Sequence, residues 1–563
     1  MQSKNLILAI TLSLAVMFGW TYLSQEMGWT PSPEQLQAEQ AAAAKKQAEQ
    51  AVAKQVAPTS TPAKPLTQFT PASGKDVIIE TPLYKAVLYT GGGILRSFEL
   101  KKYLADQVKV PLFKIFGFSF GSKNFGANEV PRANVNLISP LAASVAPLGL
   151  LVNGQPSWST GKWSFAGDNV NLESGQKSLL FVGEVDGLRV ERELTFSADS
   201  YQIVEKLRFV ALGDQARSVR VGYSVGEDTS ASTGGYYDAM RVAWGLTGEY
   251  VEESDRETLE QTGVQTTGSI LWAAASSTYF MSAIAPANTS NLTLKARVQN
   301  NVYRVVLEQG DIVVQPKTEV NQDVTYWIGP KVSKLLEQAP NELVNSIDLG
   351  MFSIIGSALL WCLEHLYGLV NNWGIAIILL TIGIKILFWP LTAKSYSSMA
   401  KMRKLQPMIT ELREKYADDR EALTRETMAL HKTYGINPAS GCIPMLVQLP
   451  VFFGLYQALL TSIELRGASF IAHLPGTDLI WLADLSQADP FYITPIIMGI
   501  SMFFMQKMSP PMGDPMQQKI MMFLPLIFTF MFLGFPSGLV IYWLVNNLLS
   551  MLQQWLLIKK AEK

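Results

Sequence analysis

Hydrophobic positions follow three different patterns along the chain, and the first is a single apolar run near the N-terminus. Asn5–Leu23 is unbroken by charge, with Lys4 before it and Gln25 and Glu26 after it. A helix over this run is long enough to cross the roughly 30 Å of bilayer hydrocarbon. The following residues lack the small side chains of a signal cleavage site, so we predict an uncleaved transmembrane anchor at residues 1–24.

Residues 25–75 are rich in Ala, Gln, Lys, Pro and Thr. They can bury too little apolar surface to offset the entropy cost of ordering, so they are predicted to form a low-complexity linker.

The second pattern, a period of two, begins after this linker. In residues 76–335, short runs alternate apolar and polar positions and end at Gly, Asn, Asp or Ser. This alternation predicts an antiparallel β-sandwich domain. The clearest runs are 76–79, 84–89, 188–196, 201–210, 219–225 and 302–307.

The third pattern is helical and membrane-like. Residues 345–368 have apolar side chains at helical spacing with Asp348 and Glu364 among them, which favours an amphipathic helix in the membrane interface. Longer apolar stretches then predict one transmembrane helix within 371–391 and four more within 441–558. These five stretches are 373–391, 442–460, 491–506, 520–533 and 539–558. Together with the anchor they give a six-span α-helical bundle.

Charge in the connecting segments predicts their sides of the membrane. Residues 392–440 carry nine Lys or Arg and six Asp or Glu, whereas residues 462–490 carry one Arg and four acidic residues. Because basic loops stay in the cytoplasm, the first segment is predicted inside and the second outside. The same rule places both chain ends, including the basic tail 559–563, in the cytoplasm and the β domain outside.

The inside segment has its own helical pattern. Apolar residues three or four apart within 392–440 predict a cytoplasmic helical hairpin, whose second helix would bury either Met428 or Leu430. Its basic residues can face acidic lipid or ribosomal RNA, and a solvated face that only sets topology is an equally good interpretation. The candidate contact residues are Lys401, Arg403 and Lys404.

Composition excludes several classes of protein. Of 563 residues, 48% are hydrophobic and 17% are charged, below the roughly 25% charged of soluble domains, so an ordinary cytosolic enzyme is not expected. The net charge of −1 gives no basic excess for binding DNA. Cys362, Cys442 and three histidines are too few for a disulfide framework or a metal cluster, so we expect no metal and no cofactor.

Lys385 is the most informative single residue, because it lies inside the apolar stretch 373–391. An ionisable side chain at membrane depth costs on the order of 2.5–3.5 kcal/mol, so Lys385 is expected to face protein or water. The core of the five C-terminal stretches contains no Asp or Glu, which argues against a proton relay or an aspartyl protease. In the alternative interpretation, Lys385 snorkels to the cytoplasmic interface.

A lysine without an acidic partner is suited to transient pairing with an acidic group of a substrate. Three polar residues of the predicted spans are expected to line a hydrated groove with it: Thr381, Gln448 and Asn546. Thr381 lies one turn before Lys385 on the same helix face, and the other two come from different spans. The alternative for each is a hydrogen bond that only joins helices.

Six segments carry a resemblance to a known family. They are Phe388-Trp389-Pro390-Leu391-Thr392, Tyr434-Gly435-Ile436-Asn437-Pro438, Gly441-Cys442-Ile443-Pro444 with Gln448-Leu449-Pro450, Met502–Pro510, Asp514-Pro515-Met516-Gln517-Gln518-Lys519 and Phe535-Pro536-Ser537-Gly538-Leu539. In these the chain resembles the YidC/Oxa1/Alb3 family of membrane protein insertases. The anchor and β domain resemble the Gram-negative form, whose periplasmic domain is a β supersandwich similar to sugar mutarotases.

This resemblance implies a multi-pass protein of the bacterial inner membrane that inserts and helps fold nascent membrane proteins without enzymatic chemistry. It implies a hydrophilic groove open to cytoplasm and lipid, contacts with membrane lipids, the Sec translocon and the ribosome, and a positive residue, usually arginine, at the position of Lys385. Two other classes stay open from the residues alone. One is a small-solute transporter or channel, and the other is a membrane-anchored periplasmic enzyme that binds or modifies carbohydrate.

Overall fold

The computed structural model describes residues 61–62, 73–105, 112–115, 118–121, 133–229, 239–416, 419–435, 443–508 and 515–562. The predicted anchor and nearly all of the linker lie outside these ranges. The chain divides into two compact units, residues 1–64 with 318–320, and the remainder. In the first unit, strand β1 (Thr61–Pro62) pairs antiparallel with residues 318–319. Apart from residues 318–320, which begin strand β25 (Thr318–Pro330), the other described elements belong to the second unit.

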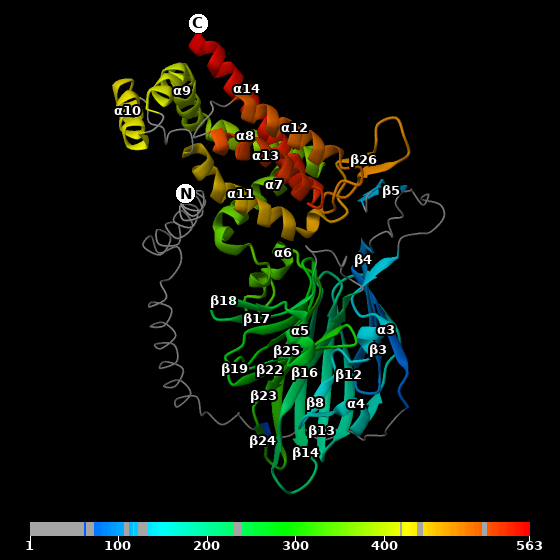
Figure 1. Cartoon of the computed structure of the whole chain (residues 1–563). Helices are drawn as coiled ribbons and strands as arrows, with labels where there is room; N and C mark the ends of the chain where they lie inside the picture. The colour runs from blue at the N-terminus through cyan, green and yellow to red at the C-terminus, as the bar shows by residue number, and fades with distance from the viewer. Residues whose placement is uncertain are drawn as a thin grey trace. The chain divides into compact units, whose positions relative to one another are not determined.

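Strands make up most of the described chain before residue 330 (Figure 1). The largest sheet runs β10 (Lys162–Phe165), β12 (Gln176–Val185), β13 (Leu188–Ser197), β14 (Gln202–Ala211), β25 (Thr318–Pro330), β21 (Phe280–Pro286), β20 (Trp272–Ser276), β17 (Arg241–Leu246) and β18 (Glu249–Glu253). A second runs β19 (Val264–Gly268), β22 (Leu292–Gln299), β23 (Val302–Gln309), β16 (Val221–Asp228), β8 (Leu150–Val152) and β9 (Gln155–Pro156). A third runs β11 (Val170–Asn171), β2 (Asp76–Glu80), β3 (Tyr84–Tyr89), β4 (Ile94–Leu104) and β7 (Asn134–Asn136).

Smaller elements complete this part of the chain. They are the pairs β15 (Arg217–Val219) with β24 (Ile312–Val314) and β5 (Phe113–Ile115) with β6 (Phe118–Phe120), and the short helices α3 (Pro140–Ala143), α4 (Ser157–Thr160), α5 (Arg256–Gln261) and α6 (Ser333–Leu336).

The two largest sheets pack face to face. Every residue of β16 and β21 is buried, and β16 packs against β20 and β21. In the third sheet, strand β3 instead alternates buried and half-buried positions, which is the period of two seen in the sequence. A large sheet-rich domain is therefore confirmed, in which β11 pairs parallel with β2.

Local turn chemistry fixes the register of the longest hairpin. Strands β12 and β13 pair from Val185 opposite Leu188 outward, joined by Asp186 and Gly187. Both turn residues have positive φ, 48° and 71°. An Asp-Gly pair is the usual solution for such a two-residue turn, because Gly has no Cβ to clash there.

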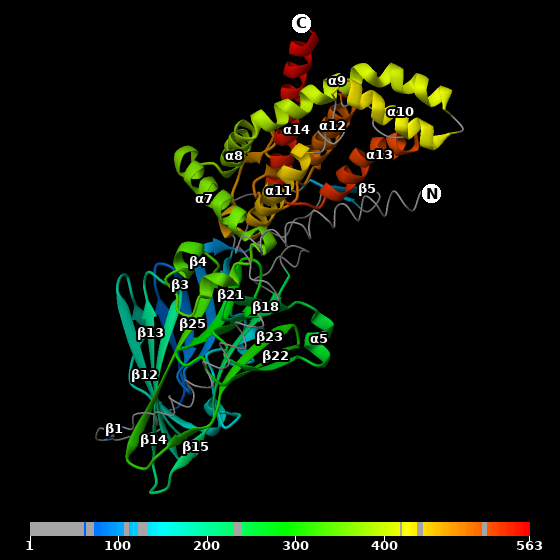
Figure 2. The same cartoon turned by 90° about the vertical axis from the view of Figure 1, so that its left-hand side faces the viewer.

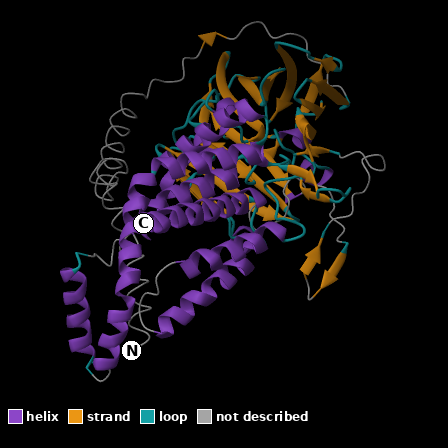
Figure 3. Ribbon diagram, turned by 90° about the horizontal axis from the view of Figure 1, so that it is seen from above, coloured by secondary structure: helices purple, strands orange, loops and turns teal. Residues whose placement is uncertain are grey.

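After residue 350 the described chain is mainly helical (Figures 2 and 3). The helices are α7 (Ser353–Val370), α8 (Trp373–Leu387), α9 (Trp389–Lys415), α10 (Arg420–Thr433), α11 (Ile443–Thr461), α12 (Ile493–Met508), α13 (Pro515–Phe532) and α14 (Ser537–Glu562). The 3-10 turns η2 (Leu343–Ser346) and η3 (Gly350–Phe352) precede α7, and η5 (Ile463–Leu465) and the pair β26 (Ile471–His473) and β27 (Ile480–Leu482) lie between α11 and α12. Each of the five apolar stretches expected to span the membrane overlaps one of these helices.

The predicted span at 373–391 is not one straight helix. Helix α8 ends at Leu387, and α9 starts at Trp389 with its axis bent by 66°. Pro390 explains the break, because proline cannot donate a backbone hydrogen bond, disfavours helix in the residue before it and suits the first turn of a new helix. Helix α8 thus ends before the apolar stretch does.

Length and composition single out few helices as membrane spans. Among the described residues, Gly350–Val370 is long and apolar enough to cross a membrane on its own. The bent pair of α8 and the first part of α9 is a second candidate if the two helices count as one span. Apolar helices at 447–461, 493–508 and 521–532 are shorter. The interfacial position of residues 345–368 and the six spans therefore stay predictions.

Glycines allow the helices to approach closely. The backbones of Gly356 on α7 and Gly454 on α11 meet, so that a Cβ at Gly356 would lie 3.1 Å from the Gly454 carbonyl oxygen. A Cβ at Gly499 on α12 would clash with Thr529 Oγ1 on α13. Small residues at crossings are how helices pack tightly where no hydrophobic effect drives them together.

Helices α9 and α10 pack side by side (Figure 2). Met402, Leu405 and Ile409 of α9 are buried together, and Leu430 of α10 packs against them. Met428 is 64% exposed, so of the two candidates it is the half-buried Leu430 that packs against α9.

Candidate functional site

Helix α14 has its polarity inverted relative to a helix of a water-soluble protein. One face exposes Leu548, Leu552, Trp555 and Leu556, whereas the opposite face buries polar side chains. This buried polar stripe consists of Asn546, Asn547, Ser550, Gln553 and Gln554. The positions recur three or four residues apart, so they share one side of the helix. An apolar outer face with a polar inner face suits a helix surrounded by lipid.

The buried polar stripe holds Lys385. The lysine side chain is 8% exposed, and its Nζ donates a 2.8 Å hydrogen bond to Ser550 Oγ. Ser550 Oγ in turn donates to the backbone oxygen of Asn546, at 2.7 Å. The ion pairs of the described residues do not include Lys385. The ammonium is thus directed toward α14 and is held there by a neutral hydroxyl.

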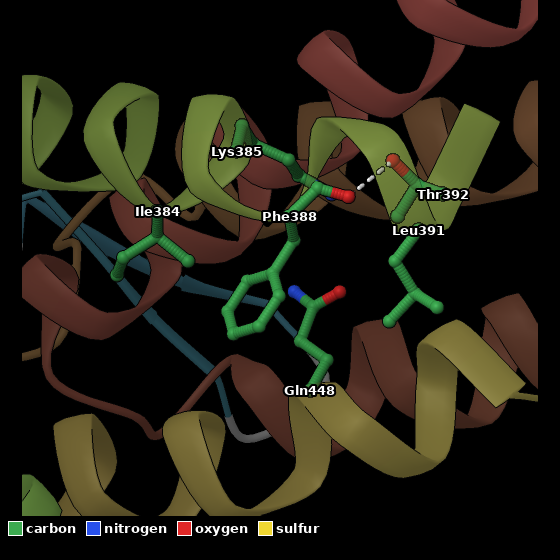
Figure 4. A pocket seen from close by; sticks show the side chains of 6 residues that line it. All are labelled: Ile384, Lys385, Phe388, Leu391, Thr392 and Gln448. Carbon is green, nitrogen blue, oxygen red and sulfur yellow. Dashed lines mark hydrogen bonds between the residues drawn. The ribbon is translucent and has the colours of Figure 1, made fainter.

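Gln448 and Asn546 meet directly. Gln448 Nε2 on α11 donates to Asn546 Oδ1 on α14 at 2.7 Å. Gln448 also borders a small cavity of about 10 Å³, enough for about one water molecule, and its side chain extends from α11 to the ring of Phe388 (Figure 4). The other lining residues are Ile384, Lys385, Leu391 and Thr392.

Thr381 does not join this network. It is 1% exposed, and its Oγ1 donates to the Ile377 carbonyl of its own helix at 2.7 Å. Threonine commonly makes this bond to the preceding turn, which uses its only proton. Of the four residues predicted to line a groove, the structure connects Lys385, Gln448 and Asn546 through α14, and the Thr381 hydroxyl bonds within α8.

Several polar residues near Lys385 were not among those predicted from the sequence. Gln553 Nε2 donates to Thr392 Oγ1 at 2.6 Å, and Ser550 Oγ accepts from Lys385 Nζ at 2.8 Å. Ser550 and Gln553 follow Asn546 by four and seven residues, which is one helix face. That periodicity of polar residues in an apolar helix was the signal that would have found them.

Part of the buried polar stripe has spare hydrogen-bonding capacity. The side-chain oxygens of Asn547, Gln553 and Gln554 are buried and accept no hydrogen bond from the described residues. Their nitrogens are bonded to Ser501 Oγ, Thr392 Oγ1 and the Met508 carbonyl, at 3.2, 2.6 and 3.0 Å. The stripe therefore offers acceptors to a polar ligand.

Residues 462–490 are hydrogen-bonded to the N-terminal ends of three helices, α8, α12 and α14. Asn372, at the start of α8, donates to the Phe470 carbonyl at 3.1 Å, and Ser537 N, at the start of α14, donates to the Gln487 carbonyl at 2.7 Å. Asp489 is 1% exposed and accepts hydrogen bonds from Trp481 Nε1, Phe491 N and Thr494. This end of the helix group is closed by well-bonded chain.

The three basic residues predicted on the hairpin lie on α9. Lys401 and Lys404 are exposed, as a surface contact would require. The side chain of Arg403 lies outside the described part of the chain.

The β domain contains a buried charge pair with a structural role. Arg192 Nε donates to Glu205, and Tyr326 donates to the same carboxylate at 2.8 Å. Burial raises the pKa of the Tyr326 phenol well above its usual range, so it stays a donor. Among the described residues no group of three His, Cys, Asp or Glu side chains is arranged to hold a metal ion.

Comparisons with known proteins cover nearly the whole chain. The family model described as 60Kd inner membrane protein matches residues 365–563, and the model of the YidC periplasmic domain matches residues 123–362. Two relatives named membrane protein insertase YidC match all of this chain over all of their own length. The protein of Nitratidesulfovibrio vulgaris strain DSM 19637 is 50% identical, and that of Lawsonia intracellularis is 48% identical.

Solved structures show weaker likeness. One described as an active YidC insertase is 18% identical with a TM-score of 0.34, covering 88% of this chain and 94% of its own. A galactose mutarotase-like protein of Lactobacillus casei is 8% identical with a TM-score of 0.28, covering 45% of this chain and 100% of its own. The identity of the sequence relatives over their full length is decisive, and this chain belongs to the YidC family of membrane protein insertases.

Proposed function

We propose that this chain inserts nascent membrane proteins into the bacterial inner membrane through a polar groove between α8, α11 and α14. The single observation that carries this proposal is Lys385, a buried cation whose partner is a neutral serine hydroxyl. A charge kept at membrane depth beside a hydroxyl is ready to pair with an acidic group that arrives with a substrate.

In the proposed mechanism, the hydrophilic segment of the substrate enters the groove first. Its acidic side chain pairs with Lys385, since two opposite charges 4 Å apart attract by about 4 kcal/mol at an effective dielectric constant of ~20. Its polar backbone bonds to the free acceptors of Asn547, Gln553 and Gln554. Both interactions lower the barrier to crossing without ATP.

The adjoining hydrophobic segment then moves into lipid. Burial of its apolar surface, at roughly 25 cal/mol per Å², supplies the free energy of insertion. The exposed apolar faces of α12 and α13, which include Phe503, Phe504, Phe523 and Ile527, form a wall compatible with that movement. No covalent step is needed, which agrees with relatives named as insertases rather than as enzymes of carbohydrate chemistry.

The proposed topology has six spans with both ends of the chain in the cytoplasm. The basic hairpin of α9 and α10 lies inside, and the β domain and residues 462–490 lie in the periplasm. The closed end formed by residues 462–490 supports a groove that opens to the cytoplasm. Lys401, Arg403 and Lys404 are proposed to contact acidic lipid or the ribosome, and the chain is proposed to work alone or beside the Sec translocon.

Proteoliposomes containing the full chain test this proposal. The substrates are two single-span proteins whose translocated tails differ only by Glu in one and Gln in the other. Lys385→Arg should retain insertion of the Glu tail, Lys385→Ala should reduce it at least about tenfold, and Lys385→Glu should abolish it. Insertion of the Gln tail by the same vesicles is the internal control for the amount of folded protein.

Equal insertion of the Glu tail by wild type, Lys385→Ala and Lys385→Glu would reject a role for the charge. Failure of wild type to insert either tail would reject the groove as the route of insertion.

A further inference from the structure

The hydrogen bonds around Ser550 give its hydroxyl a fixed orientation. A serine hydroxyl has one proton and two acceptor lone pairs. The proton is directed at the Asn546 carbonyl, 2.7 Å away, because a carbonyl can only accept. The lone pairs are therefore left for donors, and Lys385 Nζ at 2.8 Å is one of them.

The bond to the Asn546 carbonyl sets how other groups can approach Ser550 Oγ. Because the serine proton points along α14, Lys385 Nζ binds at a lone pair of that oxygen, and the hydroxyl thereby defines where the ammonium of Lys385 lies.

The position of Ser550 is itself fixed by the turn of α14 that carries it. Asn546, one turn earlier, accepts from Gln448 of α11 through its side chain and from Ser550 through its backbone. One helical turn thus connects the lysine of α8 with the glutamine of α11. Ser550 is 4% exposed and Asn546 is 9% exposed, so bulk solvent does not compete strongly for these bonds.

We propose that Ser550 is the positioning residue for Lys385, and that it thereby determines the preference of the groove for acidic translocated segments. This inference rests on the proposed function. Lysine has a long, flexible stem and a single point of charge, so it needs an external acceptor to hold its ammonium in one place. Without Ser550, the ammonium would occupy several positions, and a substrate carboxylate would pair with it less often.

Two substitutions of matched shape isolate the hydroxyl. Ser550→Thr keeps a hydroxyl on Cβ. Ser550→Val has the same shape as the threonine variant but carries no hydroxyl. The measured quantity is the ratio of insertion of the Glu tail to that of the Gln tail in proteoliposomes of the full chain. A change in the amount of folded protein alters both tails equally and leaves this ratio unchanged.

Ser550→Val should lower the ratio roughly three- to tenfold, the range for a hydrogen bond of this kind, and Ser550→Thr should stay near wild type. In a Lys385→Ala background, which has no ammonium to position, Ser550→Val should leave the ratio unchanged. A merely structural role for Ser550 would affect both tails in both backgrounds.

The outcomes separate the two proposals. If Lys385→Ala lowers the ratio but Ser550→Val does not, Ser550 has no positioning role while the proposed charge mechanism stands. An equal loss with Ser550→Val and Ser550→Thr would also overturn the inference, because the hydroxyl would not be the relevant group. If Lys385→Ala leaves the ratio at the wild-type value, the charge mechanism itself fails.

Discussion

Replacement of Asp489 by alanine tests whether residues 462–490 firmly close one end of the helix group. The carboxylate is 1% exposed and accepts four hydrogen bonds. Oδ1 accepts from Trp481 Nε1 at 3.0 Å and from Phe491 N at 2.9 Å. Oδ2 accepts from Thr494 N at 2.7 Å and from Thr494 Oγ1 at 2.9 Å. Alanine removes every acceptor at once.

The expected loss follows from these bonds. A hydrogen bond to a charged group contributes about 1.5–3 kcal/mol, and a buried donor left without a partner costs about 1–3 kcal/mol. Neighbouring bonds of one carboxylate are not additive, so the four together do not reach the simple sum. We expect the local opening free energy around the start of α12 to fall by about 3 kcal/mol, a factor of roughly a hundred.

Amide hydrogen exchange measures this opening directly, because the amides of Phe491 and Thr494 are bonded to Asp489. In Asp489→Ala their exchange should accelerate by about two orders of magnitude, in the full chain in detergent or vesicles. Asp478→Ala is the matched control, since Asp478 lies in the same segment and is exposed. Exchange at Thr494 that stays within about threefold of wild type would refute the assigned role of Asp489.

Two further predictions concern stability. Gly499→Ala should lower the unfolding temperature of the helical part, because the new Cβ would clash with Thr529 Oγ1. Gly383→Ala, whose new Cβ would have nothing within 4 Å, should be neutral or stabilising. Equal unfolding temperatures for the two variants would contradict the close crossing. Burial raises the pKa of the Glu464 carboxyl above its ordinary value of 4.5, so its stabilising contribution is complete below pH 4.5 and is lost as the pH rises through the raised pKa. Glu464→Gln, which resembles the protonated form, should therefore unfold at a higher temperature than wild type at pH 8, with the difference shrinking toward pH 4, and the opposite trend would count against it.

Elements with strong local patterns could be predicted from the sequence. The run Tyr84–Tyr89 is a strand with those bounds, and the apolar stretches from residue 373 onward contain helices, because periodicity records which face of an element is buried. The helix break at Phe388 also has a local cause in the sequence, Pro390, but the hydrophobic pattern alone does not reveal it. Apolar residues continue past the bend, and apolarity carries no information about helix direction.

The site itself was only partly predictable. Lys385 could be singled out because a charge in an apolar stretch is costly wherever the stretch packs. Gln448 and Asn546 could be singled out because they are polar side chains in apolar stretches. Thr381 was expected beside them, yet its hydroxyl bonds to its own helix, since a threonine can use its proton locally whatever lies across the groove.

By itself, the sequence determined the kinds of elements, the change from a sheet-rich part to a helical part, the family, and the presence of a lysine inside an apolar stretch, with no Asp or Glu in the core of the five C-terminal stretches. The tertiary structure decided which groups surround that lysine. Ser550 follows Lys385 by 165 residues and lies 2.8 Å from it, as Oγ to Nζ. Such a contact depends on the crossing angle of α8 and α14 and on the rotation of each helix about its axis. The side-chain periodicity of one helix carries no information about the orientation of another helix.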